Sequence, residues 1–359
     1  MKVLSMGLDN SVLNKNSALA GRVVEYGKLV EKYTIIVPNR EDKTVDLSER
    51  VRAIGIGATN KFFAVLKMRY GCRKLLKAED YDIITVQDQY YLAIIGLLLS
   101  KKFKSGLEIQ IHGFEKFYGL RKLIARYVLP RTDAIRTVSQ RLKRQLIDEF
   151  GVKEDKITVV PIYTRIKNYE LRIRDYGVKD KFIFLTVGRL VPVKNIEMQI
   201  RAMAEMIKKY KEAELWIVGD GSEKEKFELE IRNWKLEINV KLLGWKNNLD
   251  EYYNAADAFV LTSNSEGWGM AVIEAASYGL PIIMTDVGCA GEVIKNGESG
   301  IVISVGDQGK LEESMVKLIE DKELRRKLGE NAKQAIMKLP SEKETLGLYK
   351  KSWETALTN

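Results

Sequence analysis

Hydrophobic and polar positions follow two alternating patterns along this chain. Short apolar runs, typical of strands buried on both faces, alternate with longer segments whose apolar residues recur at helical spacing. In the first half the predicted strands are Lys2–Met6, Tyr33–Val37, Val51–Gly55, Asp82–Val86, Glu108–His112, Ala134–Val138 and Ile157–Pro161. Helices are predicted near Ser17–Val30, Lys61–Lys77, Tyr90–Lys101, Phe117–Leu129 and Gln140–Phe150. Such alternation predicts a parallel sheet covered by helices.

A second alternating series follows a polar stretch, Ile162–Asp180, with weaker periodicity. Its predicted strands are Phe182–Val187, Glu214–Val218, Val240–Leu243, Ala258–Thr262, Pro281–Thr285 and Gly300–Ile303. Its predicted helices lie near Asn195–Tyr210, Ser222–Leu236, Asn248–Ala255, Ala271–Tyr278 and from Gly309 onward.

The two series predict an α/β protein with two Rossmann-like, doubly wound parallel-sheet domains facing a cleft. We expect an N-terminal domain over residues 1–165, a linker over 166–180 and a C-terminal domain over 181–340. The remaining segment, 341–359, is predicted to be a helix that packs back on the N-terminal domain.

The net charge of +10 is concentrated in the first half of the chain. Residues 1–165 hold 30 Lys and Arg against 18 Asp and Glu, whereas the remainder holds 29 against 31. The excess lies mainly in two segments: Lys61–Lys77 has six cations and no acid, and Lys116–Arg144 has nine cations and one acid. Both mix cations with apolar residues at helical spacing, which favours an anionic membrane surface as partner. A nucleic-acid partner is the alternative, although no recognised nucleic-acid-binding module is present.

From other features of the composition we expect a cytoplasmic protein, held peripherally at the inner face of the membrane. The two cysteines, Cys72 and Cys289, offer neither a disulfide framework nor a cysteine-rich metal site. The first residues run directly into a predicted strand and do not resemble a signal peptide. The longest apolar run, Tyr90–Leu99, is too short to cross a bilayer.

The most informative segment places two carboxylates, Glu266 and Glu274, across a glycine-rich turn between two predicted strands. Gly267 and Gly269 flank Trp268 in this turn, and Met270 leads into the next helix. A glycine-rich turn that opens a helix presents backbone N–H groups and the positive end of the helix, which suits a phosphate. We therefore expect a ligand site at this edge of the second sheet.

Three further loops of the second domain have features suited to a ligand. Gly188 follows the first strand, and Arg189 and Lys194 are spaced to clamp a diphosphate. Gly219 follows the second strand, and Gly244 with Trp245 follows the third, where a base or ribose could rest.

The single histidine, His112, ends a predicted strand of the first domain before Gly113. A lone histidine in this position can act as an acid, a base or a hydroxyl-orienting group. No cluster of metal-ligand residues is evident, so no metal is expected.

These motifs together resemble the retaining glycosyltransferases of the GT-B fold, specifically glycosyltransferase family 4. The resemblance rests on the Glu266-x7-Glu274 signature and on four further motifs along the second domain, with His112-Gly113 at the position of an acceptor-domain histidine. These further motifs are Gly188-Arg189-Leu190 with Lys194, Gly219-Asp220-Gly221, Tyr252 to Asp257, and Thr285 to Gly288 with Glu292. The resemblance to this family is strong over nearly all of the second domain and weak over the first.

The resemblance implies transfer of a sugar, with retention and without metal or cofactor, from a nucleotide diphosphate sugar to a glycan or lipid-linked acceptor. Glu266 would contact the donor sugar, His112 would lie near the reacting carbon, and Glu274 would hold the ribose. Arg189, Lys194 and the turn from Gly267 to Met270 would hold the phosphates. Gly219, Gly244 and Trp245 would lie near the nucleoside.

The acceptor side is assigned to Gly7, Asp9 and Gly113, although Gly7 replaces the glycine pair usual in the family. The segment after Pro161 also departs from the usual pattern. Two alternatives stay open: a nucleotide-sugar epimerase of the same architecture, and a basic nucleic-acid-binding protein. The sequence leaves the base and sugar of the donor undetermined.

Overall fold

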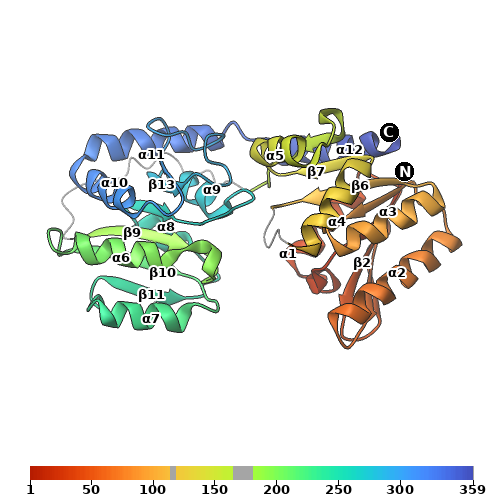
Figure 1. Cartoon of the computed structure of the whole chain (residues 1–359), viewed down its shortest axis with the longest axis horizontal. Helices are drawn as coiled ribbons and strands as arrows, with labels where there is room; N and C mark the ends of the chain where they lie inside the picture. Colours follow the sequence, from red (N-terminus) through yellow and green to blue (C-terminus); the bar gives the residue numbers. More distant parts are fainter. Residues whose placement is uncertain (114–118, 165–180, 359) are drawn as a thin grey trace. The chain divides into compact units, whose positions relative to one another are not determined.

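The computed structural model describes residues 1–113, 119–164 and 181–358, without the side chains of Lys61 and Phe62. The chain divides into two compact units (Figure 1). Unit 1 comprises Met1–Tyr163 with Pro340–Asn359, and unit 2 comprises Thr164–Leu339. The predicted linker 166–180 and the start of the predicted helix at Phe117 lie outside the described residues.

Unit 1 is built on an eight-stranded sheet with the order β3-β4-β2-β1-β5-β6-β7-β8. Its strands are β1 (Lys2–Met6), β2 (Lys32–Asn39), β3 (Lys43–Ser48), β4 (Val51–Gly57), β5 (Ile83–Val86), β6 (Gly106–Ile111), β7 (Ala134–Thr137) and β8 (Ile157–Val159). Its helices are α1 (Ala18–Gly27), α2 (Lys61–Ala78), α3 (Tyr91–Phe103), α4 (Leu120–Val128), α5 (Gln140–Phe150) and α12 (Glu342–Thr358). All strand pairs except β3–β4 are parallel.

Strand β3 is the one strand of the described residues that the sequence pattern did not predict. It pairs antiparallel with β4 at the edge of the sheet, so the sheet of unit 1 is mixed rather than wholly parallel. Its residues are exposed or half-buried in alternation, because an edge strand contributes little to the core. Only Val45 and Leu47 supply apolar positions in this segment, too few for a clear strand signal.

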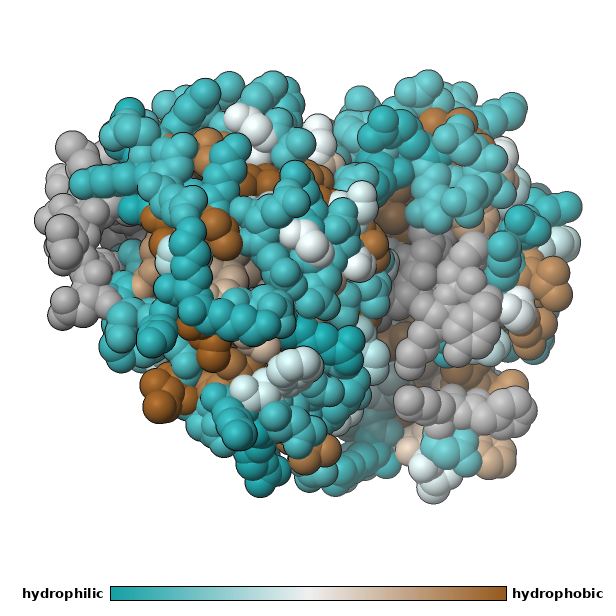
Figure 2. Space-filling model, turned by 60° about the vertical axis from the view of Figure 1, so that its left-hand side comes forward, coloured by the Kyte–Doolittle hydropathy of each residue, from teal (hydrophilic) through white to brown (hydrophobic). Residues whose placement is uncertain are grey.

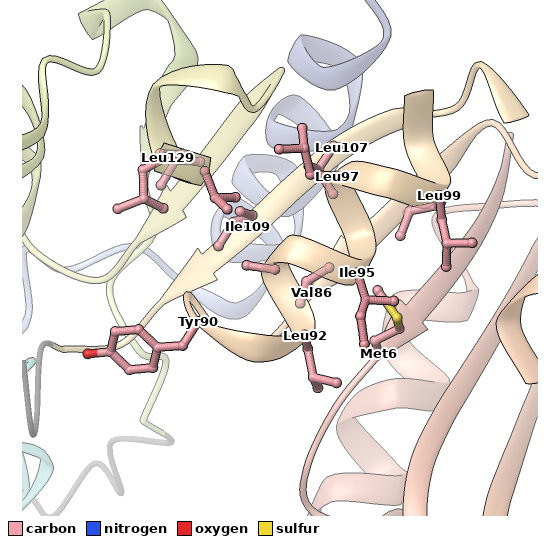
Figure 3. Close-up of a cluster of buried hydrophobic side chains, with 14 of the residues drawn as sticks. Met6, Val86, Tyr90, Leu92, Ile95, Leu97, Leu99, Leu107, Ile109 and Leu129 are labelled. Carbon is pink, nitrogen blue, oxygen red and sulfur yellow. The ribbon is translucent and has the colours of Figure 1, made fainter. Parts of the chain in front are cut away.

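The main core of unit 1 lies between the sheet and helices α2 to α5. Met6, Val86, Leu107 and Ile109 project from the strands toward α3, where Leu92, Ile95, Leu97 and Leu99 meet them (Figure 3). By contrast, the face of the molecule in Figure 2 is mainly hydrophilic, with hydrophobic residues in small separate groups.

The other face of this sheet carries α1 and the C-terminal helix α12, which contacts β5 to β8. The fully buried carboxylate of Glu108 on β6 accepts hydrogen bonds from Ser352 Oγ at 2.5 Å and from Trp353 Nε1 at 3.1 Å. Arg136 on β7 has its guanidinium 3.7 Å from the same carboxylate and 3.7 Å from the Tyr349 ring centroid. These contacts secure α12 to unit 1, and Arg136 is therefore a core residue rather than part of the predicted basic surface 116–144.

Unit 2 has a six-stranded, wholly parallel sheet with the order β11-β10-β9-β12-β13-β14. Its strands are β9 (Phe182–Val187), β10 (Ala213–Val218), β11 (Val240–Gly244), β12 (Ala258–Leu261), β13 (Ile282–Thr285) and β14 (Ile301–Ile303). Its helices are α6 (Ile196–Met206), α7 (Lys224–Asn233), α8 (Asp250–Ala255), α9 (Met270–Ser277), α10 (Gln308–Glu320) and α11 (Lys322–Ile336). In the unit's own numbering this is the 3-2-1-4-5-6 order of the Rossmann fold. The predicted class, two Rossmann-like α/β domains, is confirmed.

Candidate functional site

The strand order of unit 2 reverses between β9 and β12, which are hydrogen-bonded neighbours. At such a reversal the loops after the two strands run to opposite faces of the sheet, and open α/β folds bind ligands at the carboxyl edge there. Gly188 follows β9, and the segment Thr262–Gly269 follows β12. The two most informative sequence motifs of this unit therefore meet at its switch point.

The loop after β9 passes extremely close to the loop after β10. A Cβ atom on Gly219 would lie 1.8 Å from the carbonyl oxygen of Gly188, and Gly219 has a φ of +147°. Only glycine fits both the conformation and the approach. This close packing holds the loop that carries Arg189 and Lys194; Arg189 is exposed and Lys194 is half-buried.

The loops after β9 and β12 are joined by several hydrogen bonds. Asn264 donates its backbone N–H to the carbonyl of Val193 at 2.7 Å. Buried Thr262 donates its hydroxyl to the carbonyl of Asn195 at 2.9 Å and accepts from Gln199 Nε2 at 2.8 Å. This network fixes Lys194 relative to the start of the glycine-rich turn.

Glu266 lies directly on this junction. Its Oε1 forms an ion pair with Lys194 Nζ and accepts a hydrogen bond from Ser263 Oγ at 2.7 Å. Side-chain exposure is 13% for Glu266 and 21% for Lys194, so most of the pair is removed from water. The residues predicted to hold a sugar and a phosphate thus already contact each other.

The turn after Glu266 leads through Gly267 and buried Trp268 into α9. Gly269 caps the helix in the left-handed region, at a φ of +96°, and Met270 is its first residue. Gly288 supports the turn from β13, because a Cβ there would lie 2.5 Å from the carbonyl oxygen of Trp268. The N-terminus of α9 therefore opens beside the ion pair with its positive dipole end.

Glu274 lies on the second turn of α9, half-buried. Tyr253 of α8 donates its hydroxyl to Glu274 Oε2 at 2.9 Å and stacks on Tyr278, with ring centroids 5.0 Å apart. Desolvation by burial raises the pKa of Glu274, and the hydrogen bond from Tyr253 opposes part of that rise. This carboxylate is suited to accepting hydrogen bonds from ligand hydroxyls.

The loop after β11 lies next to that after β10, because Gly219 donates its N–H to the carbonyl of Gly244 at 3.0 Å. Gly244 adopts a φ of +70°. Trp245, which follows it, is 69% exposed although it is a large aromatic residue. A broad exposed ring of this kind is suited to stacking on a base.

The four candidate residues of unit 1 lie at the carboxyl edge of its own sheet, after β1 and β6. Gly7 is buried, and a Cβ there would lie 2.9 Å from Gln87 Oε1. Asp9 is exposed and accepts a hydrogen bond from the backbone N–H of Ser11 at 2.9 Å. The carbonyl of Gly113 accepts from Gln89 Nε2 at 2.7 Å.

His112 follows β6. Part of the residue is exposed to solvent, but the surrounding protein atoms exclude much of the water from around the imidazole ring. This desolvation, followed by the charges of Arg136 and Arg22, lowers the pKa of His112 below its ordinary value. The imidazole is therefore neutral near pH 7 and can both donate and accept a hydrogen bond.

Sequence reasoning missed the roles of Ser263, Tyr253 and Thr262 in holding these groups. Their signal was weak: Ser263 and Thr262 end a strand as ordinary polar residues, and Tyr253 comes from a separate helix. Within the described residues no group of three or more His, Cys, Asp or Glu side chains is arranged to hold a metal ion. In the same residues no helix is long and apolar enough to cross a membrane.

Comparison with known proteins identifies the family of this chain. The family model for glycosyl transferases group 1 matches residues 170–335, and that for glycosyltransferase family 4 matches residues 31–162. Two Rossmann-like units with these loops define a glycosyltransferase of the GT-B fold. The chain belongs to the group 1 glycosyltransferases of family 4.

Curated relatives match most of the chain. N-acetyl-α-D-glucosaminyl L-malate synthase of Bacillus anthracis is 28% identical over 276 residues, 73% of this chain and 72% of that protein. UDP-Gal:α-D-GlcNAc-diphosphoundecaprenol α-1,3-galactosyltransferase of Escherichia coli is 28% identical, with 70% of each chain covered.

Among solved structures, sucrose-phosphate synthase of Thermosynechococcus elongatus has a TM-score of 0.80 at 18% identity, covering 99% of this chain and 98% of that chain. Anabaena HepE, solved with UDP and glucose, has a TM-score of 0.77 at 18% identity and covers 99% of each chain. At this identity the two structures support the fold alone.

Proposed function

We propose that this glycosyltransferase moves a sugar, with retention at the anomeric carbon, from a nucleotide diphosphate sugar to a glycan or lipid-linked acceptor. One observation carries the proposal: Lys194, Glu266 and the N-terminus of α9 meet at the switch point of unit 2. A cation and a helix N-terminus suit a diphosphate, and an adjacent carboxylate suits sugar hydroxyls.

The donor extends across the loops of unit 2 in this proposal. Its phosphates bind Lys194, Arg189 and the backbone from Gly267 to Met270. Its ribose hydroxyls donate to Glu274, which Tyr253 holds in place. The base lies beside Gly219, Gly244 and the exposed ring of Trp245.

The chemical step requires stabilisation of a departing diphosphate. Lys194, Arg189 and the dipole of α9 supply positive charge at the position where negative charge develops, so the proposal needs no metal ion. Glu266 leaves Lys194 and accepts hydrogen bonds from the sugar. Neutral His112 orients a sugar hydroxyl near the reacting carbon. The acceptor hydroxyl attacks from the face that the phosphate leaves, and a phosphate oxygen takes its proton.

The acceptor is assigned to unit 1, with Gly7, Asp9 and Gly113 at the edge of its sheet. The name of the Escherichia coli relative specifies a diphosphoundecaprenol acceptor, which is lipid-linked. The basic excess of residues 1–165 favours the same kind of acceptor, taken at the cytosolic surface of a membrane.

A thermal-shift screen against UDP-, GDP- and ADP-sugars tests the donor. A donor that binds the folded state raises the melting temperature. The double variant Arg189→Ala/Lys194→Ala should lose that shift, and the control Lys208→Ala/Lys211→Ala, two exposed cations of unit 2, should keep it. Absence of a shift with every donor, or a shift preserved in the double variant, would overturn the assignment. Proton NMR of the product anomer tests retention.

A further inference from the structure

Three neighbouring helices of unit 1 expose large apolar side chains on their outer surface. Helices α2, α3 and α4 contact one another in series and lie side by side over one face of the sheet (Figure 1). The exposed apolar residues, which we call the α2–α4 face, are Phe63, Leu66, Tyr70, Tyr91, Leu98, Leu120, Leu123 and Tyr127. Tyr70 is 73% exposed and Leu123 is 64% exposed. Such a concentration is unusual for a surface that faces only water.

The apolar residues of this face do not serve the core. On α2 the core side is formed by Ala64, Met68 and Cys72, whereas Phe63, Leu66 and Tyr70 recur three and four residues apart on the opposite side. This spacing produces one continuous stripe along the exposed side of the helix.

Helix α4 repeats the same spacing with Leu120, Leu123 and Tyr127, while its Ala125 and Val128 are buried. On α3 the core side includes Leu92, Ile95 and Leu99 (Figure 3), and Tyr91 and Leu98 are exposed, seven residues apart. All three helices therefore present an outer apolar stripe in addition to their core stripe.

The same three helices carry many Lys and Arg residues and no acidic residue. The three helices comprise forty residues and contain no Asp or Glu. Their exposed cations are Lys67, Arg69, Arg73, Lys74, Lys77, Lys101, Lys102 and Arg126. Apolar and aromatic side chains flanked by cations match the acyl boundary and the phosphates of an anionic bilayer. A second copy of this face would instead bring two positive surfaces together, and a nucleic acid would leave the leucines without a partner.

We propose that the α2–α4 face docks on an anionic phospholipid bilayer, with its apolar side chains in the interface and its cations at lipid phosphates. This inference rests on the proposed function, because a lipid-linked acceptor is taken at a membrane. Docking through unit 1 brings the acceptor-binding unit to the surface that holds the acceptor. Both the stripe on α2 and the stripe on α4 contribute.

Sedimentation with vesicles tests this docking. We expect the protein to bind vesicles of phosphatidylcholine and phosphatidylglycerol at 3:1, and to bind pure phosphatidylcholine at least tenfold more weakly. The variants Phe63→Ser/Leu66→Ser/Tyr70→Ser and Leu120→Ser/Leu123→Ser/Tyr127→Ser should each weaken binding to the mixed vesicles at least tenfold. The matched control replaces Leu229, Trp234 and Ile238, three exposed apolar residues of unit 2, by Ser and should bind as the unchanged protein does.

Several outcomes would overturn the docking. The protein could fail to bind the mixed vesicles, or the control variant could lose vesicle binding as much as the two triple variants do. The third such outcome is that the unchanged protein self-associates and both triple variants are monomers. Binding of RNA that both triple variants weaken, without vesicle binding, would assign the face to nucleic acid. The donor-induced thermal shift, measured on the same variants, separates the two proposals: retained shift without vesicle binding refutes only the docking, and the reverse refutes only the donor site.

Discussion

Replacing Glu266 by Gln should strengthen binding of a nucleoside diphosphate while it weakens transfer. The carboxylate of Glu266 occupies Lys194 when no donor is bound, so a diphosphate must compete for that cation. The pair is mostly buried but not fully, which makes its net contribution about 1 kcal/mol. Its removal should therefore tighten UDP binding roughly fivefold. Transfer should fall about 10²–10³-fold, because the contact of Glu266 with the sugar is lost.

The complementary variant, Lys194→Ala, should have the opposite effect on binding. It removes a charge-assisted contact to phosphate worth about 1.5–3 kcal/mol, so UDP binding should weaken roughly 10–150-fold. Isothermal titration calorimetry with UDP, or with the diphosphate selected by the donor screen, measures both changes. Glu298→Gln is the matched control: it removes the same charge from unit 2 at a side chain that is 72% exposed, and it should change nothing. Weaker UDP binding in Glu266→Gln, or equal tightening in the control, would refute the competition.

Three other substitutions test separate parts of the structure. Gly219→Ala forces a Cβ into a backbone carbonyl and should destabilise the protein by roughly 2–4 kcal/mol, measured as a lower urea midpoint; an unchanged midpoint would contradict the close approach. Trp353→Ala empties a fully buried site under α12 and should cost about 3–5 kcal/mol, whereas Trp353→Phe should cost less. Tyr253→Phe removes a hydrogen bond that lowers the pKa of Glu274, so that pKa should rise further. Donor binding needs the ionised carboxylate of Glu274, so on acidification the variant should lose donor affinity at a higher pH than the unchanged protein does. A raised pKa also means that protonated Glu274 stabilises the folded protein. In the absence of donor, that contribution to the free energy of unfolding should be lost as pH rises through the pKa of Glu274. Titrations of UDP between pH 4.5 and 7 check this, and an unshifted profile would contradict it.

The sequence predicted most strands because parallel strands buried on both faces are continuous apolar runs. Strands β1 and β9 match their predicted bounds, Lys2–Met6 and Phe182–Val187. The sequence pattern did not predict the edge strand β3 because four of its six positions are exposed. The basic segment 116–144 was interpreted as a surface, yet Arg136 within it is buried, since charge counts do not reveal burial.

The sequence indicates which loops carry the candidate residues, but it does not indicate which side chains contact each other. Glycines after strands and a carboxylate pair across a turn are local signals, and they single out Gly188, Gly269 and Glu266 as candidates. The pairing of Glu266 with Lys194 joins residues 72 positions apart, so no local pattern contains it. The support of Glu274 by Tyr253 similarly depends on how α8 packs against α9.

Helix α12 also determines the order in which the protein can be completed during synthesis. The helix belongs to unit 1 but follows unit 2 along the chain. All of unit 2 is therefore synthesised before α12, and the sheet of unit 1 keeps Glu108 and Arg136 uncovered until Trp353 arrives. Throughout that interval an unpaired apolar and charged surface is open to chaperones. A chain truncated before α12 has the whole of unit 2 joined to an incomplete unit 1, and cellular proteases can recognise and remove such an incompletely folded unit.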